Sequence, residues 1–205
     1  MNKAVFLDRD GVLNDLVFRH EEGIYDSPYC LEEFRLLPGA AEAIAHIHRL
    51  GMLAIVVSNQ PGVAKRKCDV AAMNQLTNHM RQELEQQGAS LDGIYYCLHH
   101  PEAMVEGLRV ACDCRKPKPG LLLQAAQQHS IDLSCSYMVG DSPKDIQAGM
   151  AAGCRTVLVR GHNGVEMPPE VVPHFVAGNL LSAVQEIRKD FPKKEESDGD
   201  ILRLR

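Results

Sequence analysis

Short apolar runs alternate with stretches of helical periodicity along most of this chain. The runs are continuous and too short for helices, which is typical of strands that are buried on both faces of a sheet. Strands are predicted at residues 4–7, 53–57, 94–96, 136–139, 156–159 and 175–176. Between them, apolar residues recur every three or four positions and predict helices at 40–50, between Asp69 and Gly88, at 119–128, through Ile146 and Met150, and at 180–188.

Strands that alternate with helices predict an α/β fold with a parallel, doubly wound sheet. In such sheets, ligands bind at the carboxyl ends of the strands. Polar residues follow three of the predicted strands immediately, namely Asp8 with Asp10, Ser58 with Asn59, and Asp141. We therefore expect these side chains to meet at one edge of the sheet.

The remaining stretches are predicted to lie outside the sheet and its helices. Residues 15–38 are interrupted by glycine and proline, so we expect a long loop beside the functional site. Residues 161–173 are also predicted to form a loop. The segment 192–205 is charged and poor in apolar residues, which predicts a disordered tail after a single domain over residues 1–191.

Composition narrows the range of functions. The 205 residues are 45% hydrophobic, which is enough for a full core in one domain. The formal net charge of −5 and the pI near 6.0 argue against a nucleic-acid partner, because nucleic-acid binding needs a basic surface. No apolar run is long enough to cross a bilayer, and the N-terminus has no signal-peptide pattern. We therefore expect a cytoplasmic monomer with no membrane partner.

Asp8 and Asp10 form a D-x-D-G sequence with Gly11, directly after the first strand. At an extended strand end both carboxylates would point the same way, and Gly11 would let the chain turn sharply. Two like charges so close repel each other, so a cation must lie between them or one must hold a proton. Mg²⁺ binds one or two carboxylates together with waters and substrate phosphate oxygens, and so suits the pair. The alternative is an Asp-rich turn with both carboxylates in water.

Seven cysteines are an odd number, and three of them lie close to a histidine in the sequence. Cys97-x-His99 and Cys112-x-Cys114 are two pairs of soft ligands joined by a loop, as a tetrahedral structural Zn²⁺ site needs. Four protein ligands leave no open position for catalysis. We therefore expect a zinc loop over residues 97–116 in a reducing compartment, with unligated loop thiols as the alternative.

Four sequence pieces occur in a fixed order: FLDRDG, VVSNQ, CRKPKPG and MVGDSPKD. Together they closely resemble the haloacid dehalogenase (HAD) superfamily of phosphotransferases, over residues 5–145. The resemblance implies that Asp8 attacks phosphorus, and that Asp10 first protonates the leaving alcohol and then deprotonates the attacking water. It also implies that Asp8, Asp141 and the backbone carbonyl of Asp10 hold Mg²⁺.

The same resemblance indicates which residues bind the substrate. Ser58 and Lys116 would donate to the transferred phosphoryl group and take part in catalysis with Asp8 and Asp10, while Asp145 would orient Lys116 or a metal-bound water. Taken singly, Ser58 fits a helix cap and Lys116 a solvated surface charge. The joint presence of the aspartates disfavours both of these readings. The predicted substrate-binding residues are Asp8, Arg9, Asp10, Ser58, Asn59, Gln60, Arg115 and Lys116.

Within the superfamily, the string GIYYCLHHP…CDCRKPKPG closely resembles the D-glycero-D-manno-heptose 1,7-bisphosphate 7-phosphatase family. That resemblance implies a capless enzyme whose zinc loop partly walls the site. It also implies a phosphorylated sugar as substrate and a place in heptose synthesis for cell-surface lipopolysaccharide. Arg115 would contact the part of the substrate remote from the transferred phosphoryl group. Histidinol-phosphate phosphatase is a close relative with a shorter loop, so the length of residues 100–111 favours the heptose enzyme.

Some positions depart from the heptose family and leave the substrate open. Ser142 stands where a lysine is frequent, the segment after Asn14 is longer, and Pro61 and Arg66 replace a small polar residue and a glycine. Histidinol-phosphate phosphatase or a broader sugar phosphatase are the alternatives within enzymes. A zinc-stabilised binding module without catalysis is the alternative of another class. The repelling pair of aspartates argues against that module, because a scaffold without catalysis has no need of it.

Overall fold

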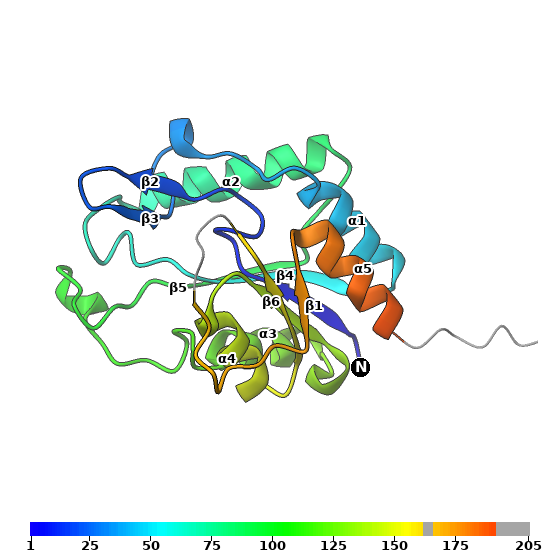
Figure 1. Cartoon of the computed structure of the whole chain (residues 1–205). Helices are drawn as coiled ribbons and strands as arrows, with labels where there is room; N and C mark the ends of the chain where they lie inside the picture. The colour runs from blue at the N-terminus through cyan, green and yellow to red at the C-terminus, as the bar shows by residue number, and fades with distance from the viewer. Residues whose placement is uncertain (162–165, 192–205) are drawn as a thin grey trace, which may run out of the picture.

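A six-stranded parallel sheet forms the centre of the computed structural model, which describes residues 1–161 and 166–191 (Figure 1). The strand order is β5-β4-β1-β6-β7-β8, and every neighbouring pair is parallel. The strands are β1 (Ala4–Leu7), β4 (Leu53–Asn59), β5 (Gly93–Cys97), β6 (Tyr137–Gly140), β7 (Arg155–Val159) and β8 (Phe175–Ala177). The predicted parallel, doubly wound α/β fold is confirmed.

Helices cover both faces of this sheet (Figure 1). One face packs against α1 (Ala40–Arg49), α2 (Val70–Gln86) and α5 (Leu180–Asp190), and the other against α3 (Gly120–His129) and α4 (Pro143–Ala151). The α2 helix begins as predicted, because the side chain of Asp69 accepts a hydrogen bond from the backbone N–H of Ala72 at 2.7 Å.

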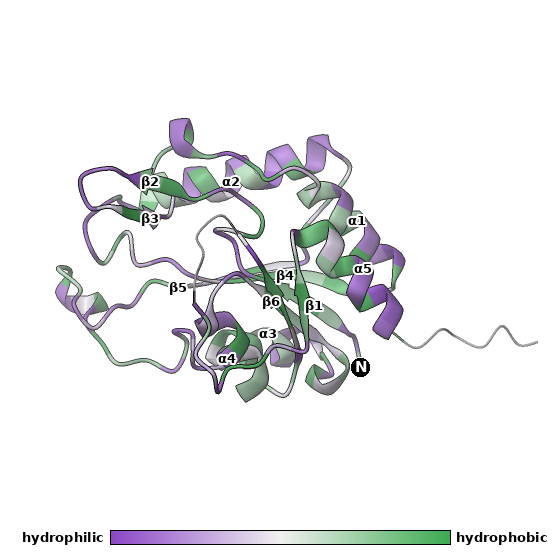
Figure 2. Ribbon diagram, in the orientation of Figure 1, coloured by the Kyte–Doolittle hydropathy of each residue, from purple (hydrophilic) through white to green (hydrophobic). Residues whose placement is uncertain are grey.

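Alternate residues of β1 belong to the two cores on either side of the sheet. Val5 and Leu7 pack on the α1 and α5 side, whereas Ala4 and Phe6 pack on the α3 and α4 side. All four are fully buried, which explains why the strand reads as a continuous apolar run. In Figure 2 the hydrophobic colour is concentrated in the strands and the inner helix faces. The strand that carries Asp8 is therefore fixed from both sides.

The prediction of an irregular loop over residues 15–38 was wrong in part. The stretch contains an antiparallel hairpin of β2 (Val17–Arg19) and β3 (Ile24–Asp26), followed by a short 3₁₀ helix, η1 (Leu31–Glu33). The strands have only three residues each, so their alternation is too short to detect in the sequence. Phe18 and Tyr25 pair across the hairpin with ring centroids 5.0 Å apart, which helps to hold it together.

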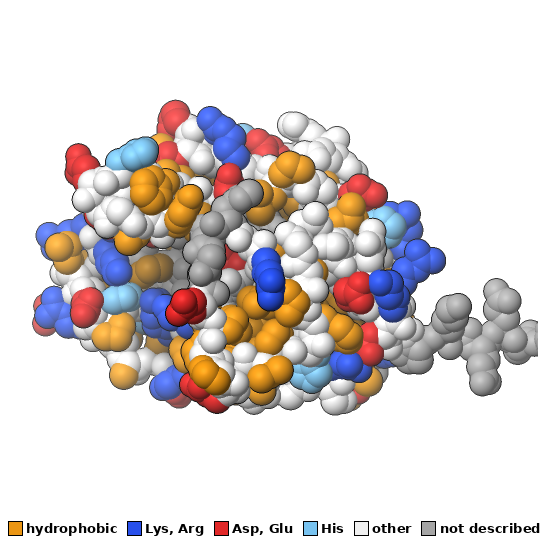
Figure 3. All heavy atoms as spheres, in the orientation of Figure 1, with side chains coloured by type: hydrophobic (Ala, Val, Ile, Leu, Met, Phe, Trp, Pro, Cys, Tyr) orange, Lys and Arg blue, Asp and Glu red, His pale blue; other side chains and the backbone are white. Residues whose placement is uncertain are grey.

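The other boundaries agree with the predicted ones or differ from them by one or two residues. The largest useful difference is in β4, which extends to Asn59 and so includes Ser58 and Asn59 in the strand. Within the described residues, no helix has the length and apolar character that crossing a membrane requires. Acidic and basic side chains are interspersed on the face shown in Figure 3. The predicted tail at 192–205 lies outside the described residues, and so does part of the predicted loop at 161–173.

Candidate active site

The turn after β1 brings its residues against the end of β6. The backbone N–H of Asp8 donates to the carbonyl of Val139 at 2.9 Å. Gly11 follows with a φ of +80°, and a Cβ at this position would lie 2.1 Å from Oδ2 of Asp141. Only glycine permits this approach. The turn therefore places the Asp141 carboxylate close to that of Asp8, as expected for two parallel strands that end at the same edge.

Lys116 lies between two carboxylates. Its Nζ is 2.9 Å from Oδ1 of Asp8 and 2.5 Å from Oδ1 of Asp145, and it donates to the carbonyl of Val57 at 2.9 Å. The Lys116 and Asp145 side chains are almost fully buried. Burial alone would lower the pKa of Lys116, but Asp145 and Asp8 outweigh it and raise that pKa. The ammonium group therefore stays charged and is directed at Asp8.

Neighbouring elements hold this ion pair in place. Oδ2 of Asp145 accepts hydrogen bonds from the backbone N–H and the hydroxyl of Ser142, at 3.0 and 2.6 Å, which forms a capping box at the start of α4. At the end of β4, the amide of Asn59 bonds both the N–H and the carbonyl of Lys116 at 3.0 Å. The hydroxyl of Ser58 accepts a hydrogen bond from Nε2 of Gln60 at 3.1 Å, and Ser58 opposes the effect of burial, which raises the pKa of the nearby Asp8.

Asp10 has a separate set of partners. Nε of Arg9 and Nδ2 of Asn14 each donate to its Oδ1 at 2.9 Å. The hydroxyl of Ser27 and Nε2 of Gln60 donate to Oδ2 at 2.8 and 2.7 Å. Burial would raise the pKa of Asp10, but Arg9 and the three other donors outweigh it and lower that pKa. Asp10 is therefore ionised in this arrangement.

The carboxylates of Asp8 and Asp141 fit a divalent cation. Burial, followed by the nearby Asp145, raises the pKa of Asp8 to about 6, although Lys116 opposes the shift. Burial and Asp8 raise the pKa of Asp141 to about 8. Oxygens of Asp8, Asp141 and Asp145 lie within 4.8 Å of one another. Since Asp145 is already bound to Lys116 and Ser142, a cation such as Mg²⁺ fits best between Asp8 and Asp141.

An open cleft of about 190 Å³ gives access to these groups. It is lined by Asp8, Asp26, Ser27, Asn59, Pro61, Arg115, Lys116, Ser142, Lys144 and Asp145. A larger cavity of about 290 Å³ lies beside Gly11 and the start of α5, and among the described residues its only charged lining residues are Asp15 and Arg160. The chemistry therefore assigns the active site to the smaller cleft.

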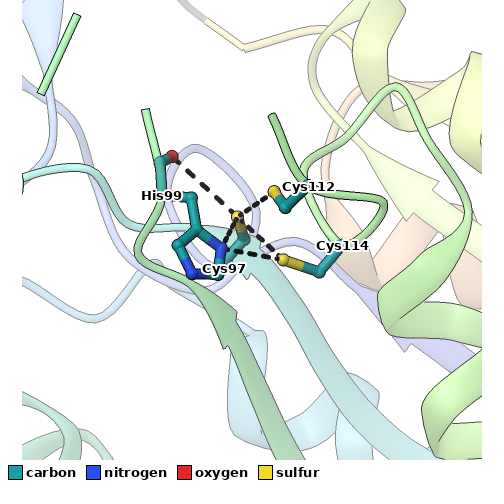
Figure 4. Close-up of side chains that lie close together, drawn as sticks. All are labelled: Cys97, His99, Cys112 and Cys114. Carbon is teal, nitrogen blue, oxygen red and sulfur yellow. Dashed lines mark hydrogen bonds between the residues drawn. The ribbon is translucent and has the colours of Figure 1, made fainter. Parts of the chain in front are cut away.

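Four cysteine and histidine side chains at the end of β5 point toward one another (Figure 4). Sγ of Cys97 is 3.6 Å from Sγ of Cys112 and 3.2 Å from Sγ of Cys114, and Nδ1 of His99 is 3.3 Å from Sγ of Cys114. A tetrahedral zinc with bonds of ~2.3 Å places its sulfur ligands roughly 3.7 Å apart. Burial raises the pKa of Cys97 and of Cys114, so these thiols need a cation beside them to ionise together. The four predicted ligands fit a structural zinc.

This cluster is joined to the cleft by the residues that follow it. Arg115 comes directly after Cys114, and its Nη1 donates to the carbonyl of His99 at 3.2 Å. Lys116 is next in the chain. At Gly120, a Cβ would lie 2.3 Å from the carbonyl oxygen of Asp113, so α3 begins in close contact with the loop. The conformation of the cysteine loop therefore determines where Arg115 and Lys116 point.

Comparison with known proteins places the chain in a family. Residues 113–183 match the HAD-hydrolase-like family model. The D-glycero-beta-D-manno-heptose-1,7-bisphosphate 7-phosphatase of Escherichia coli (strain K12) is 40% identical over 188 residues, which cover 91% of this chain and 94% of that protein. The chain belongs to this phosphatase family.

Other members agree with this assignment. The protein of the same name from Haemophilus influenzae is 39% identical over 88% of this chain and 94% of its own length. The crystal structure of D,D-heptose 1,7-bisphosphate phosphatase from B. bronchiseptica, complexed with magnesium and phosphate, superposes with a TM-score of 0.74 and 31% identity. The superposition covers 92% of this chain and 99% of the B. bronchiseptica chain. The resemblance to HAD phosphatases and to the heptose family is thereby confirmed.

The structure brings together most, but not all, of the predicted site residues. Asp8, Asn59, Arg115 and Lys116 line the cleft, and Asp141 lies beside Asp8. Four other predicted site residues are buried and do not line the cleft, namely Arg9, Asp10, Ser58 and Gln60. Substrate binding by Arg9 and Gln60 stays a prediction, and the structure gives their side chains a different contact, with Asp10.

Sequence reasoning missed three residues of the cleft. Asp26 ends the hairpin strand β3 and Ser27 follows it, in a segment for which the sequence predicts a loop, and Lys144 comes from the first turn of α4. The hairpin residues could not be placed, because only the folded hairpin brings them to the strand ends. Lys144 lies within the MVGDSPKD piece, so its position beside Asp145 was a signal that could have identified it.

Proposed function

We propose that this chain hydrolyses the 7-phosphate of D-glycero-β-D-manno-heptose 1,7-bisphosphate. The observation that carries the proposal is the contact of the Lys116 ammonium with the Asp8 carboxylate, two groups that line an open cleft. It occurs in a chain that is 40% identical, over 91% of its length, to a relative named for this activity. A nucleophilic carboxylate that faces a fixed cation is suited to attack on a phosphate ester.

In the first step, an Asp8 oxygen attacks phosphorus and forms an aspartyl-phosphate, while the bond from phosphorus to the C7 oxygen breaks. Asp10 gives its proton to that leaving oxygen. In the second step, Asp10 takes a proton from a water molecule, whose oxygen attacks phosphorus and releases inorganic phosphate from Asp8. Lys116 and Ser58 donate to the phosphoryl oxygens and offset the charge that accumulates on them.

The first step needs a proton on Asp10, whereas its present partners favour the carboxylate. Besides Ser27 and Gln60, Nη2 of Arg9 donates to Oδ2 at 3.2 Å, and the contacts of Ser27 and Gln60 can survive protonation. The hydroxyl of Ser27 can accept a hydrogen bond as well as donate one, and Gln60 can turn its amide oxygen toward Asp10. Arg9 and Asn14 can keep their contacts to Oδ1. These four side chains thus hold Asp10 in place through both protonation states.

Mg²⁺ would be held by the side chains of Asp8 and Asp141 and, as the family resemblance implies, by the backbone carbonyl of Asp10. When bound, it supplies positive charge next to the phosphoryl oxygens and the nucleophile. Zn²⁺ would be held by the cluster of Cys97, His99, Cys112 and Cys114 and would have a structural role, because all four positions are filled by protein. A single domain over residues 1–191, a cytoplasmic location and a monomeric state also stay predictions.

A panel of substrates tests the proposed function. We would measure the release of inorganic phosphate from heptose 1,7-bisphosphate, histidinol phosphate and several hexose phosphates. The proposal expects kcat/KM for the heptose bisphosphate to exceed the others by at least about tenfold, a difference of ~1.4 kcal/mol in transition-state binding. A preference for histidinol phosphate would instead assign the chain to that activity.

A further inference from the structure

Each carboxylate that lines the active-site cleft has a lysine beside it. Lys116 contacts both Asp8 and Asp145. Asp26, on the hairpin, is 2.7 Å from Nζ of Lys67, which also approaches Glu22 at 3.3 Å. Burial would raise the pKa of Asp26, but its bond to Lys67 and other hydrogen bonds outweigh it and lower that pKa. Every acidic side chain in the lining therefore has a cation beside it.

Two further cations in the lining have no such partner. Arg115 and Lys144 form no ion pair with any carboxylate in residues 1–161 and 166–191. The only hydrogen bond that the Arg115 side chain makes there is to the carbonyl of His99. Among the described residues, Arg115 and Lys144 are therefore the two lining cations that are available to pair with a bound anion.

Arg115 and Lys144 come from different elements and line the same cleft. Arg115 lies on the loop after the cysteine cluster, where it contacts His99, and Lys144 lies in the first turn of α4. Both side chains can therefore reach a ligand in this cleft. An anion bound there would gain contacts with a planar guanidinium and a flexible ammonium group.

We propose that Lys144 is a specificity-determining residue that binds, together with Arg115, the phosphate group that the reaction leaves on the sugar. The inference rests on the proposed function, since it requires a substrate with two phosphates. A cleft of about 190 Å³ is too small to enclose such a molecule, and binding sites that do so measure roughly 300–1,000 Å³. The second phosphate must therefore be bound at the rim, where Arg115 and Lys144 lie.

In this proposal, the first turn of α4 carries one residue that acts near the transferred phosphoryl group and one that binds the retained phosphate. Asp145 orients Lys116 toward the transferred phosphoryl group, and the preceding residue, Lys144, is exposed at the rim. The capping box between Ser142 and Asp145 fixes this turn. The backbone of Lys144 is therefore held in place, while its long side chain remains free to reach a phosphate.

Binding measurements on paired ligands test the inference without turnover. Calorimetric titration would use the inactive Asp8→Asn protein, with and without Lys144→Ala. The ligand pairs are heptose 1,7-bisphosphate with heptose 7-phosphate, and fructose 1,6-bisphosphate with fructose 6-phosphate. We expect Lys144→Ala to weaken binding of the bisphosphates about tenfold and of the monophosphates less than about twofold. Lys144→Arg should restore the affinity, and high salt should reduce the difference.

Lys118→Ala is the matched control. The ammonium of Lys118 pairs with Asp113 at 2.8 Å in the same part of the chain, and it does not line the cleft. Its removal should leave both ligand classes unaffected, which would exclude a general effect of lost positive charge. Steady-state kinetics should show the loss for Lys144→Ala in KM and not in kcat, because the retained phosphate takes no part in the reaction.

Three results would overturn the inference: equal losses for bisphosphates and monophosphates, no loss for either, or a parent protein that binds both classes equally. Failure of the proposed function is a separate result. It would appear as an absence of turnover of heptose bisphosphate by the unsubstituted protein. The fructose pair would still decide the role of Lys144 in that case.

Discussion

The two buried carboxylates of the cation site make stability depend on pH. Asp8 and Asp141 have pKa values raised from 3.8 to about 6 and about 8, first by burial and then by neighbouring carboxylates. The folded protein therefore holds more protons than the unfolded chain between about pH 4 and pH 8. Through these groups, the free energy of unfolding falls as the pH rises across this window.

A bound cation should reverse that trend. Without added Mg²⁺, we expect the Tm to fall, through the contribution of this pair, as the pH rises from about 5 to about 8. Excess Mg²⁺ should raise the Tm more at about pH 8 than at pH 5, because both carboxylates must be ionised to bind it. Asp141→Asn should flatten both responses. An equal Mg²⁺ shift at the two pH values would contradict the assignment of the site to these carboxylates.

Asp8 is the residue on which the proposed chemistry depends most. Asp8→Asn removes the attacking charge and a cation ligand together, so we expect kcat to fall by at least ~10³-fold. The fold should survive, because the substitution relieves repulsion from Asp145 and Asp141. Asp15→Asn is a suitable control, since Asp15 is an exposed aspartate on the same loop. A variant that keeps a tenth of the rate would rule out nucleophilic attack by Asp8.

At the scale of elements, the cysteine loop supports the catalytic residues. Cys114→Ser should lower the zinc content from about one ion per chain and reduce kcat, since Arg115 and Lys116 follow directly. Elemental analysis and steady-state kinetics on one preparation measure both. Cys135→Ser is the control, because Cys135 is exposed and outside the cluster. Normal activity in a zinc-free protein would show that catalysis does not depend on zinc binding by the cysteine loop.

The strands and the residues at their ends could be predicted, and the hairpin could not. The run from Ala4 to Leu7 is apolar throughout because it faces a core on each side, and that signal does not depend on distant residues. The hairpin is stabilised by contacts with other segments, such as Lys67 with Asp26 and the ion pair of Arg19 with Glu33. Such contacts leave no periodic pattern in the sequence.

The hydrogen-bond partners of Asp10 could not be predicted from the sequence either. The D-x-D-G motif identified Asp10, and the resemblance suggested that Gln60 and Arg9 bind substrate. Their contact with Asp10 depends on how β1, β4 and the hairpin come together, as does the contact from Ser27. Motifs therefore identified which residues matter, whereas the direction of each side chain required the folded chain.

For the molecule as a whole, all the strands and helices that the structure describes lie within residues 1–191. The last helix, α5, ends at Asp190 and packs on α1. We therefore expect a variant that ends at residue 191 to keep the Tm and, within about twofold, the kcat/KM of the full chain. Circular dichroism and the phosphate-release assay measure these. A large loss of either would show that the domain includes residues beyond 191.

The central claim is that this chain removes one particular phosphate from a sugar bisphosphate. Phosphorus NMR during turnover of heptose 1,7-bisphosphate tests it most directly, because the two phosphates of the substrate give separate signals. The account predicts that the C7 signal disappears as inorganic phosphate grows, while the C1 signal remains. Loss of the C1 phosphate, or no release from either position, would contradict it.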